Sequence, residues 1–217
     1  MTGTIGLIGI LGSHGPRTLA EELGYLILDS VPIVVITAVV YWFVRRFIHK
    51  KRFGAEFKEI RRKARLNEII RLLLVIWAAL IVCNTLLPSF NELSHLSSFF
   101  WFIPNWKIIP DIFTRGIRGI DTTHSLLNIM MFAPIGLALP FVLKQPKFGR
   151  TVLVGFCFTF GIEFIQGFSR MRDGNTDDVI CNTLGVIAGY ALYLLMKLLL
   201  PKFTAKCMIK AETANDN

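Results

Sequence analysis

The chain has 217 residues, a net charge of +9 and a composition that is 53% hydrophobic but only 18% charged. Its mean hydropathy is +0.54, a value that excludes an ordinary soluble domain and indicates an integral membrane protein. The basic residues border apolar runs rather than forming one face, so the positive-inside rule accounts for them and nucleic-acid binding is not expected.

Apolar runs predict an all-α, polytopic membrane helix bundle with five transmembrane helices. Residues 1–22 form an N-terminal arm, whose apolar patch is too short to span a bilayer and lacks the basic flank of a signal peptide. We expect residues 23–71 to hold the first span and a basic segment, residues 72–200 the main transmembrane domain, and residues 201–217 a tail. The predicted spans are Leu23–Val44, Leu72–Phe90, Leu126–Leu143, Thr151–Phe168 and Val179–Leu200.

Lysine and arginine residues predict the orientation of these spans. With the N-terminus outside, the cytoplasmic segments 45–71, 144–150 and 197–210 hold eighteen Lys and Arg, and the outer segments hold six. This bias predicts an N-out, C-in orientation in the membrane. The run from Arg45 to Arg71 is interpreted as a solvated juxtamembrane face.

The connection over residues 91–124 is long and rich in aromatic residues and prolines, which is typical of a functional loop or of one lying on the membrane surface. Its SSFFWFIP segment is expected to dip into the headgroup layer. In the span that follows, Pro134 and Pro140 flank Gly136, so a kink is predicted there, with neighbouring helices satisfying the freed carbonyls.

Polar side chains recur at one depth in the last three spans. Asn128 lies near the start of the third span, Glu163 and Gln166 near the end of the fourth, and Asn182 near the start of the fifth. Alternating orientation brings all four close to the outer surface, so we expect them to meet there. The loop that follows the fourth span places further charges above them: Arg170, Arg172, Asp177 and Asp178.

Each of these residues also has a structural explanation. Asn128 could tie two helices together, Asp177 or Thr176 could cap the fifth span, and Gly185 with Gly189 forms a small-residue packing face. The coincidence of polar groups on three spans is what favours a ligand site, because such groups are costly at membrane depth.

These segments resemble the VanZ family of bacterial membrane proteins. The first is Asn128-x-x-x-Phe132-x-Pro134-x-Gly136, followed by Leu139-Pro140. The second is Glu163-x-x-Gln166, then Arg172, Asp177-Asp178, Asn182-Thr183-Leu184-Gly185 and Gly189. The resemblance covers residues 72–200, and one position departs from it: Asn175 stands where family members commonly carry the first Asp of Arg-x-x-Asp-x-Asp-Asp. Asp173 is the alternative carboxylate. The resemblance implies a link to low-level resistance to teicoplanin-type glycopeptides, which act on the outer face of the cytoplasmic membrane.

The leading hypothesis is a pocket in the outer leaflet that binds a membrane lipid, a cell-wall precursor or a glycopeptide. Arg170 and Arg172 would meet phosphate or carboxylate. The alternative is an enzyme acting on a lipid-linked or peptidoglycan substrate, with Glu163 and Asp177 or Asp178 as acid and base.

A third hypothesis is a transporter or a subunit of a larger assembly. The absence of an inverted repeat argues against alternating access. The small-residue faces at Gly155, Gly161, Gly185 and Gly189 would suit a membrane-protein partner or a homo-oligomer.

No cofactor or metal is expected. A metal site combining His95 or His124 with Asp177 or Asp178 is conceivable, but isolated loop histidines are more often plain polar residues. The four cysteines are scattered and form no CxxC motif, so they are interpreted as small apolar fillers.

Overall fold

A computed structural model of the chain describes residues 19–53, 64–86, 105–110, 122–168 and 173–208. Its helices and strands are α1 (Leu19–Phe53), α3 (Arg65–Leu86), β1 (Trp106–Lys107), α5 (Thr122–Val142), α6 (Phe148–Gln166), β2 (Gly174–Asn175), α7 (Thr176–Leu199) and α8 (Pro201–Cys207).

Five helices within the described residues are long and apolar enough to cross a membrane. They coincide with the five predicted spans and confirm the all-α polytopic fold. Several boundaries differ from the prediction: α3 begins at Arg65 instead of Leu72, for example. The helix of α1 continues through the basic residues after Val44 as far as Phe53, and the tail contains a short further helix, α8. The SSFFWFIP segment lies outside the described residues.

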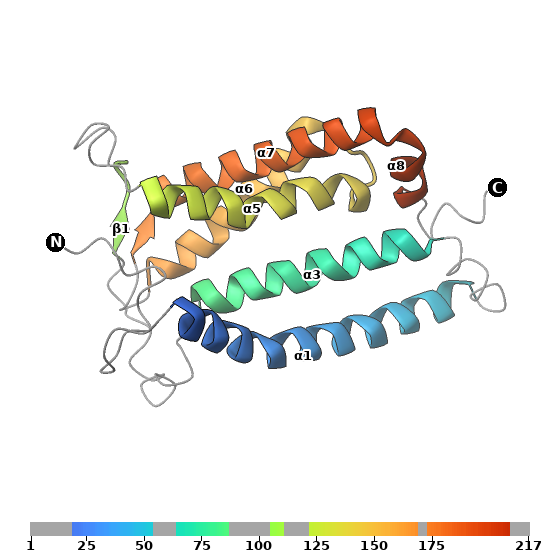
Figure 1. The fold of residues 1–217 in the computed structure, drawn as a ribbon, viewed down its shortest axis with the longest axis horizontal. Helices are drawn as coiled ribbons and strands as arrows, with labels where there is room; N and C mark the ends of the chain where they lie inside the picture. Colours follow the sequence, from blue (N-terminus) through green and yellow to red (C-terminus); the bar gives the residue numbers. More distant parts are fainter. Residues whose placement is uncertain (1–18, 54–63, 87–104, 111–121, 169–172, 209–217) are drawn as a thin grey trace.

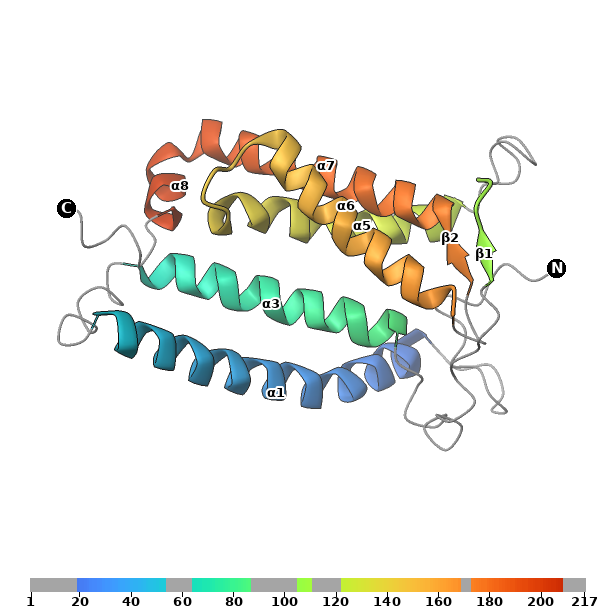
Figure 2. The same ribbon diagram turned by 180° about the vertical axis from the view of Figure 1, so that it is seen from behind.

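The helices form two layers (Figures 1 and 2). α1 and α3 lie side by side, and α5, α6 and α7 group together on the other side of α3. The paired strands lie at one end of the bundle, and α8 packs against α3 and α7 at the opposite end. We call these the strand end and the α8 end.

The most extensive contact between helices joins α5 and α7. Both helices run from the strand end to the α8 end (Figure 1), and glycines let their backbones approach closely. A Cβ atom added at Gly136 would lie 2.0 Å from the Val186 carbonyl oxygen, and one at Gly189 would lie 2.0 Å from the Ala133 oxygen. These two glycines therefore set the separation of α5 and α7.

The glycines proposed as an association surface mostly pack inside this chain. A Cβ atom at Gly155 would collide with the Val186 side chain, and one at Gly185 would lie 2.4 Å from the Ile129 oxygen. Of the four glycines Gly155, Gly161, Gly185 and Gly189, only Gly161 has open space around it. The interpretation of this set as a surface for another protein is therefore wrong for three of its members, which α5, α6 and α7 use for their own packing.

α5 runs through Pro134 and Pro140 without interruption. A proline leaves carbonyl groups in the preceding turn without their usual donor. The Trp77 indole of α3 donates a hydrogen bond of 2.9 Å to the carbonyl of Met131, three residues before Pro134. A neighbouring helix thus supplies a donor to the turn that the proline disturbs.

The glycine contacts lead to a stability prediction. Gly189→Ala should destabilise the protein by about 1–3 kcal/mol, because the new methyl group meets backbone that has no room to move. Gly161→Ala is the matched control and should leave the protein as stable or more stable, since alanine favours a helix by up to about 1 kcal/mol. Thermal unfolding of both variants in one detergent measures the difference; equal melting temperatures would contradict the close α5–α7 contact.

Candidate functional site

The strand end is organised around Trp106. β1 and β2 pair in parallel, with Trp106 opposite Gly174, and the backbone of Asn105 bonds both Gly167 and Gly174. The Trp106 indole stacks on Phe164 with ring centroids 5.4 Å apart. A Cβ atom at Gly167 would lie 1.3 Å from the indole nitrogen, so only glycine fits beneath the ring. This contact fastens the segment 105–107 to the end of α6 and the start of α7.

Asp178 lies at the centre of one polar group at this end. Its Oδ1 atom accepts a hydrogen bond of 2.8 Å from the Asn128 amide and lies 3.1 Å from Nε2 of His124. Asn128 is buried, whereas the His124 side chain is 36% exposed and that of Asp178 18% exposed. Asp178 therefore joins α5 to α7 and holds a histidine that solvent can reach.

Glu163 forms a second polar group, between α6 and α7. Its side chain is buried, and Oε2 accepts a hydrogen bond of 3.0 Å from the backbone N–H of Asn175. The Asn175 side chain in turn accepts from the N–H of Asp177 at 3.0 Å and so caps α7. Glu163 thus fixes the residue that caps α7.

This capping role explains why Asn175 can stand where VanZ family members commonly carry Asp. Asn and Asp cap a helix about equally well, because either side chain offers an oxygen to the first N–H groups. The position therefore keeps its structural role with Asn. Asp173 supplies a carboxylate nearby. Its side chain is exposed and accepts a hydrogen bond from the Asn105 amide.

Asp177 adds a third contact at the strand end. Its Oδ2 atom lies 3.7 Å from Nζ of Lys107, which β1 carries. Asp177 and Asp178 both lie in the first turn of α7, where the helix dipole favours negative charge. The start of α7 therefore keeps two carboxylates, one beside a lysine and one beside a histidine.

The remaining predicted side chains have different partners. The Gln166 amide donates to the Thr85 carbonyl of α3 at 3.0 Å. The Asn182 amide donates to the Thr159 hydroxyl of α6 at 2.8 Å, and within the described residues its buried Oδ1 atom has no partner. These two residues tie helices together and do not join the Asp178 group.

The expectation that Asn128, Glu163, Gln166 and Asn182 meet at one spot is therefore wrong in its details. They reach the same part of the bundle, but each has its own hydrogen-bond partner. Arg170 and Arg172 lie outside the described residues. His95 does too, and the described residues contain no group of three His, Cys, Asp or Glu placed to hold a metal ion.

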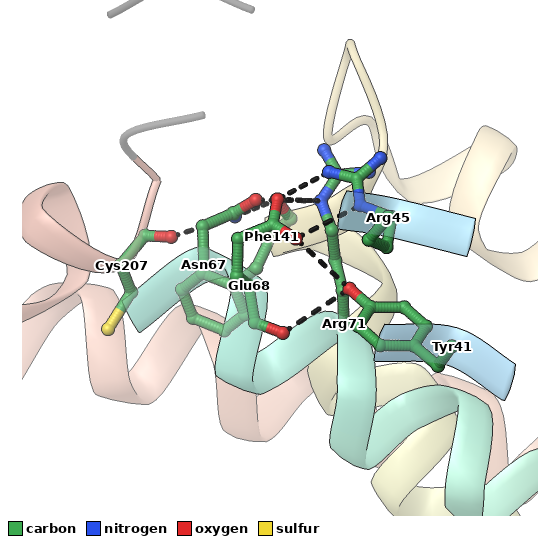
Figure 3. A network of polar contacts seen from close by, with 7 residues as sticks. All are labelled: Tyr41, Arg45, Asn67, Glu68, Arg71, Phe141 and Cys207. Atoms are coloured by element: carbon green, nitrogen blue, oxygen red, sulfur yellow. Dashed lines mark hydrogen bonds and ion pairs between the residues drawn. The ribbon is translucent and has the colours of Figure 1, made fainter. Parts of the chain in front are cut away.

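A second polar network lies at the α8 end (Figure 3). Asn67 is fully buried, and its amide donates to the carbonyls of Phe141 and Cys207 at 2.8 and 2.9 Å. Its Oδ1 atom accepts a hydrogen bond of 2.8 Å from Arg71. One asparagine therefore joins α3, the end of α5 and the end of α8.

Glu68 extends this network to α1. Its carboxylate accepts hydrogen bonds from the Arg45 guanidinium and from the Tyr41 hydroxyl, both on α1 (Figure 3). The side chains of Arg45 and Arg71 are only 19% and 15% exposed. The interpretation of 45–71 as a uniformly solvated face is therefore wrong at both of its ends. The sequence signal for this network is Asn67-Glu68 ahead of an apolar run, with Arg71 one turn later.

Of the two networks, the one at the strand end is the candidate functional site. At the α8 end, the Asn67 side chain is buried, and both of its polar atoms form hydrogen bonds within the protein. At the strand end, carboxylates, a lysine and a histidine remain partly open to solvent.

Comparison with known proteins shows the family of this chain. The model of the family described as VanZ/LLP1 matches residues 71–197, a range that includes every residue described above at the strand end. A search of curated proteins and a search of solved structures found no match. The matched range covers more than half of the 217 residues, and the chain belongs to the VanZ/LLP1 family.

Proposed function

We propose that this VanZ-like membrane protein lies in the bacterial cytoplasmic membrane with its strand end outside, where it binds a lipid, a cell-wall precursor or a glycopeptide. Through that binding it contributes to resistance to teicoplanin-type glycopeptides. One observation carries the proposal: segments far apart in the sequence meet at the strand end to hold partly exposed carboxylates beside Lys107 and His124. Packing of lipid-facing helices does not require such a group.

The charges near this group suit a ligand with phosphate or carboxylate. Arg172 directly precedes Asp173 in the sequence, and Arg170 stands two residues before Arg172; we assign both the role of meeting such a ligand. A guanidinium binds phosphate or carboxylate with two parallel hydrogen bonds. The carboxylates Asp173, Asp177 and Asp178 would complement ammonium and amide groups of the same ligand.

The orientation of the chain can be tested by cysteine labelling. In a chain whose native cysteines are replaced by alanine, Asp173→Cys should react with a membrane-impermeant maleimide on intact cells, because Asp173 is exposed at the strand end. Lys202→Cys in the exposed part of α8 should react only after the cells are permeabilised. The reverse pattern would place the strand end in the cytoplasm and remove the basis for the proposal.

Ligand binding can be tested by teicoplanin susceptibility. Arg172→Lys keeps the charge but loses the paired hydrogen bonds, so ligand affinity should fall about tenfold. Glu163→Gln replaces the carboxylate that accepts from the Asn175 N–H with a neutral amide, which weakens that hydrogen bond and the placement of the Asp177 and Asp178 carboxylates. Both variants should lower the minimal inhibitory concentration of teicoplanin toward that of cells with an empty vector.

The matched control is Arg150→Lys, an exposed arginine at the opposite end of α6, which should leave susceptibility unchanged. Protein levels are compared by immunoblot. Full resistance in a variant with both Arg172 and Glu163 changed to alanine would rule out this site.

A second function is favoured by the contact of His124 with Asp178: an enzyme acting on a lipid-linked or peptidoglycan substrate. Asp178, held by Asn128, would orient the imidazole, and His124 would accept a proton from water or a substrate hydroxyl. Glu163 is less suited to this role than Asp178, because it is buried and bonded to the backbone of Asn175.

This second function predicts a chemical product. Mass spectrometry of envelope lipids and muropeptides should show a species that depends on the protein and disappears with His124→Gln, which removes the group that exchanges the proton. His49→Gln, on α1, is the control and should leave the product intact. Identical profiles with and without the protein would exclude catalysis and leave binding.

A further inference from the structure

The contact between α6 and α7 contains polar side chains as well as apolar ones. On α6, Gly155, Thr159 and Glu163 follow one another at intervals of four residues, so they lie on one face of the helix. A Cβ atom added at Gly155 would collide with the Val186 side chain of α7. One turn farther along α6, the Thr159 hydroxyl accepts a hydrogen bond of 2.8 Å from the Asn182 amide of α7. This face of α6 therefore packs against α7.

Asn182 has a buried acceptor that the described residues do not satisfy. Asn182 is 2% exposed and Thr159 is fully buried. The Asn182 amide nitrogen bonds the Thr159 hydroxyl, but within the part of the chain that the structure describes, Oδ1 accepts no hydrogen bond. Buried polar atoms without a partner are rare in proteins, and a bound water or ion often accounts for them. The Asn182–Thr159 pair therefore points to a further partner between the two helices.

Two carboxylates favour a cation as that partner. Glu163 lies one turn after Thr159 on α6, and Asp178 lies one turn before Asn182 on α7. α6 ends and α7 begins at the strand end (Figures 1 and 2), so both carboxylates stand about 5 Å closer to that end than the Asn182–Thr159 pair. Negative charge at this distance attracts a cation more strongly than a neutral water molecule.

The oxygen atoms of the pair indicate the kind of cation. Amide and hydroxyl oxygens suit hard cations, and a hydroxyl has two acceptor lone pairs, so Thr159 can bind an ion while it accepts from Asn182. Ca²⁺ takes about six to eight oxygen ligands and Mg²⁺ keeps several waters, and a site this deeply buried does not suit either shell. A monovalent ion costs less to desolvate. Sodium is smaller than potassium and so fits better between closely packed helices.

We propose that a sodium ion binds between α6 and α7, held by Asn182 Oδ1 and the Thr159 hydroxyl oxygen and stabilised by the negative charges of Glu163 and Asp178. The ion ties α6 to α7 one turn below the strand end. This site goes beyond the function proposed above, because it lies inside the bundle and takes an inorganic ion.

Thermal unfolding of the full-length wild-type protein in one detergent tests this proposal. Melting temperatures are compared in sodium chloride, potassium chloride and N-methyl-D-glucamine chloride at equal ionic strength. Sodium that binds the folded protein alone should raise the melting temperature by about 5–10 °C at roughly one hundred times its dissociation constant. The other two salts should give the same, lower value.

Variants of α6 locate the ion. Thr159→Val removes a ligand oxygen at nearly constant shape and should abolish the sodium-dependent shift, whereas Thr159→Ser keeps the oxygen and should keep the shift. Thr151→Val is the matched control, because Thr151 is equally buried on the same helix but its hydroxyl donates to the Lys147 carbonyl. It should show the full shift.

A double variant gives an independent check on the acceptor. Asn182→Leu combined with Thr159→Val replaces both partners of the hydrogen bond with apolar groups, a change that can be nearly neutral for stability. The double variant should melt at one temperature in all three salts.

Three outcomes would overturn the proposal. The first is a single melting temperature of the wild-type protein in all three salts, which would assign a neutral water to Asn182. The second is an equal shift in sodium and potassium chloride. The third is a full sodium shift in Thr159→Val, which would place the ion elsewhere. The comparison of salts requires no variant to fold, and none of these readouts involves teicoplanin or the orientation of the chain.

Discussion

The close approach of α5 to α7 is the constraint on which the rest of the structure depends. Glycines at the contact have no side chain, so the two backbones can approach closely. The two helices also run in the same direction. Their first turns therefore lie together, which brings Asn128 and His124 of α5 to Asp178 of α7. A packing feature without polar groups of its own thus brings together the polar group at the strand end.

Burial separates the roles of the polar residues. Backbone and side-chain groups inside a bilayer must find partners within the protein, because no water is available. Asn67 and Gln166 meet this requirement by joining helices. The Asn182 amide N–H does so too, but its Oδ1 atom has no partner within the described residues. Asp178 also joins two helices, but it holds a histidine that is 36% exposed. Exposure, and not polarity alone, distinguishes a residue that can meet a ligand from one that holds the bundle together.

The sequence was sufficient for the five spans and for the polar end of the bundle, because apolar length and helical spacing determine depth and face. It did not determine which neighbour each side chain meets: Gln166 bonds Thr85, eighty-one residues away. The contact of Trp106 with Gly167 was also missed, since an aromatic loop predicts a membrane surface as readily as a strand. The interpretation of His124 as an isolated loop histidine was wrong, because it lies in the first turn of α5 and contacts Asp178 of α7.

The two ends of the bundle relate differently to the family. The polar group at the strand end lies wholly within residues 71–197, the range that the family model matches. At the α8 end, Tyr41, Arg45, Glu68 and the carbonyl of Cys207 all lie outside that range. α1 packs chiefly on α3, so it adds to the family's helices a seam whose charges come mostly from outside the matched region. The contacts that join α1 to α3 therefore lie mostly outside the region that shows the family, whereas the polar group at the strand end lies inside it.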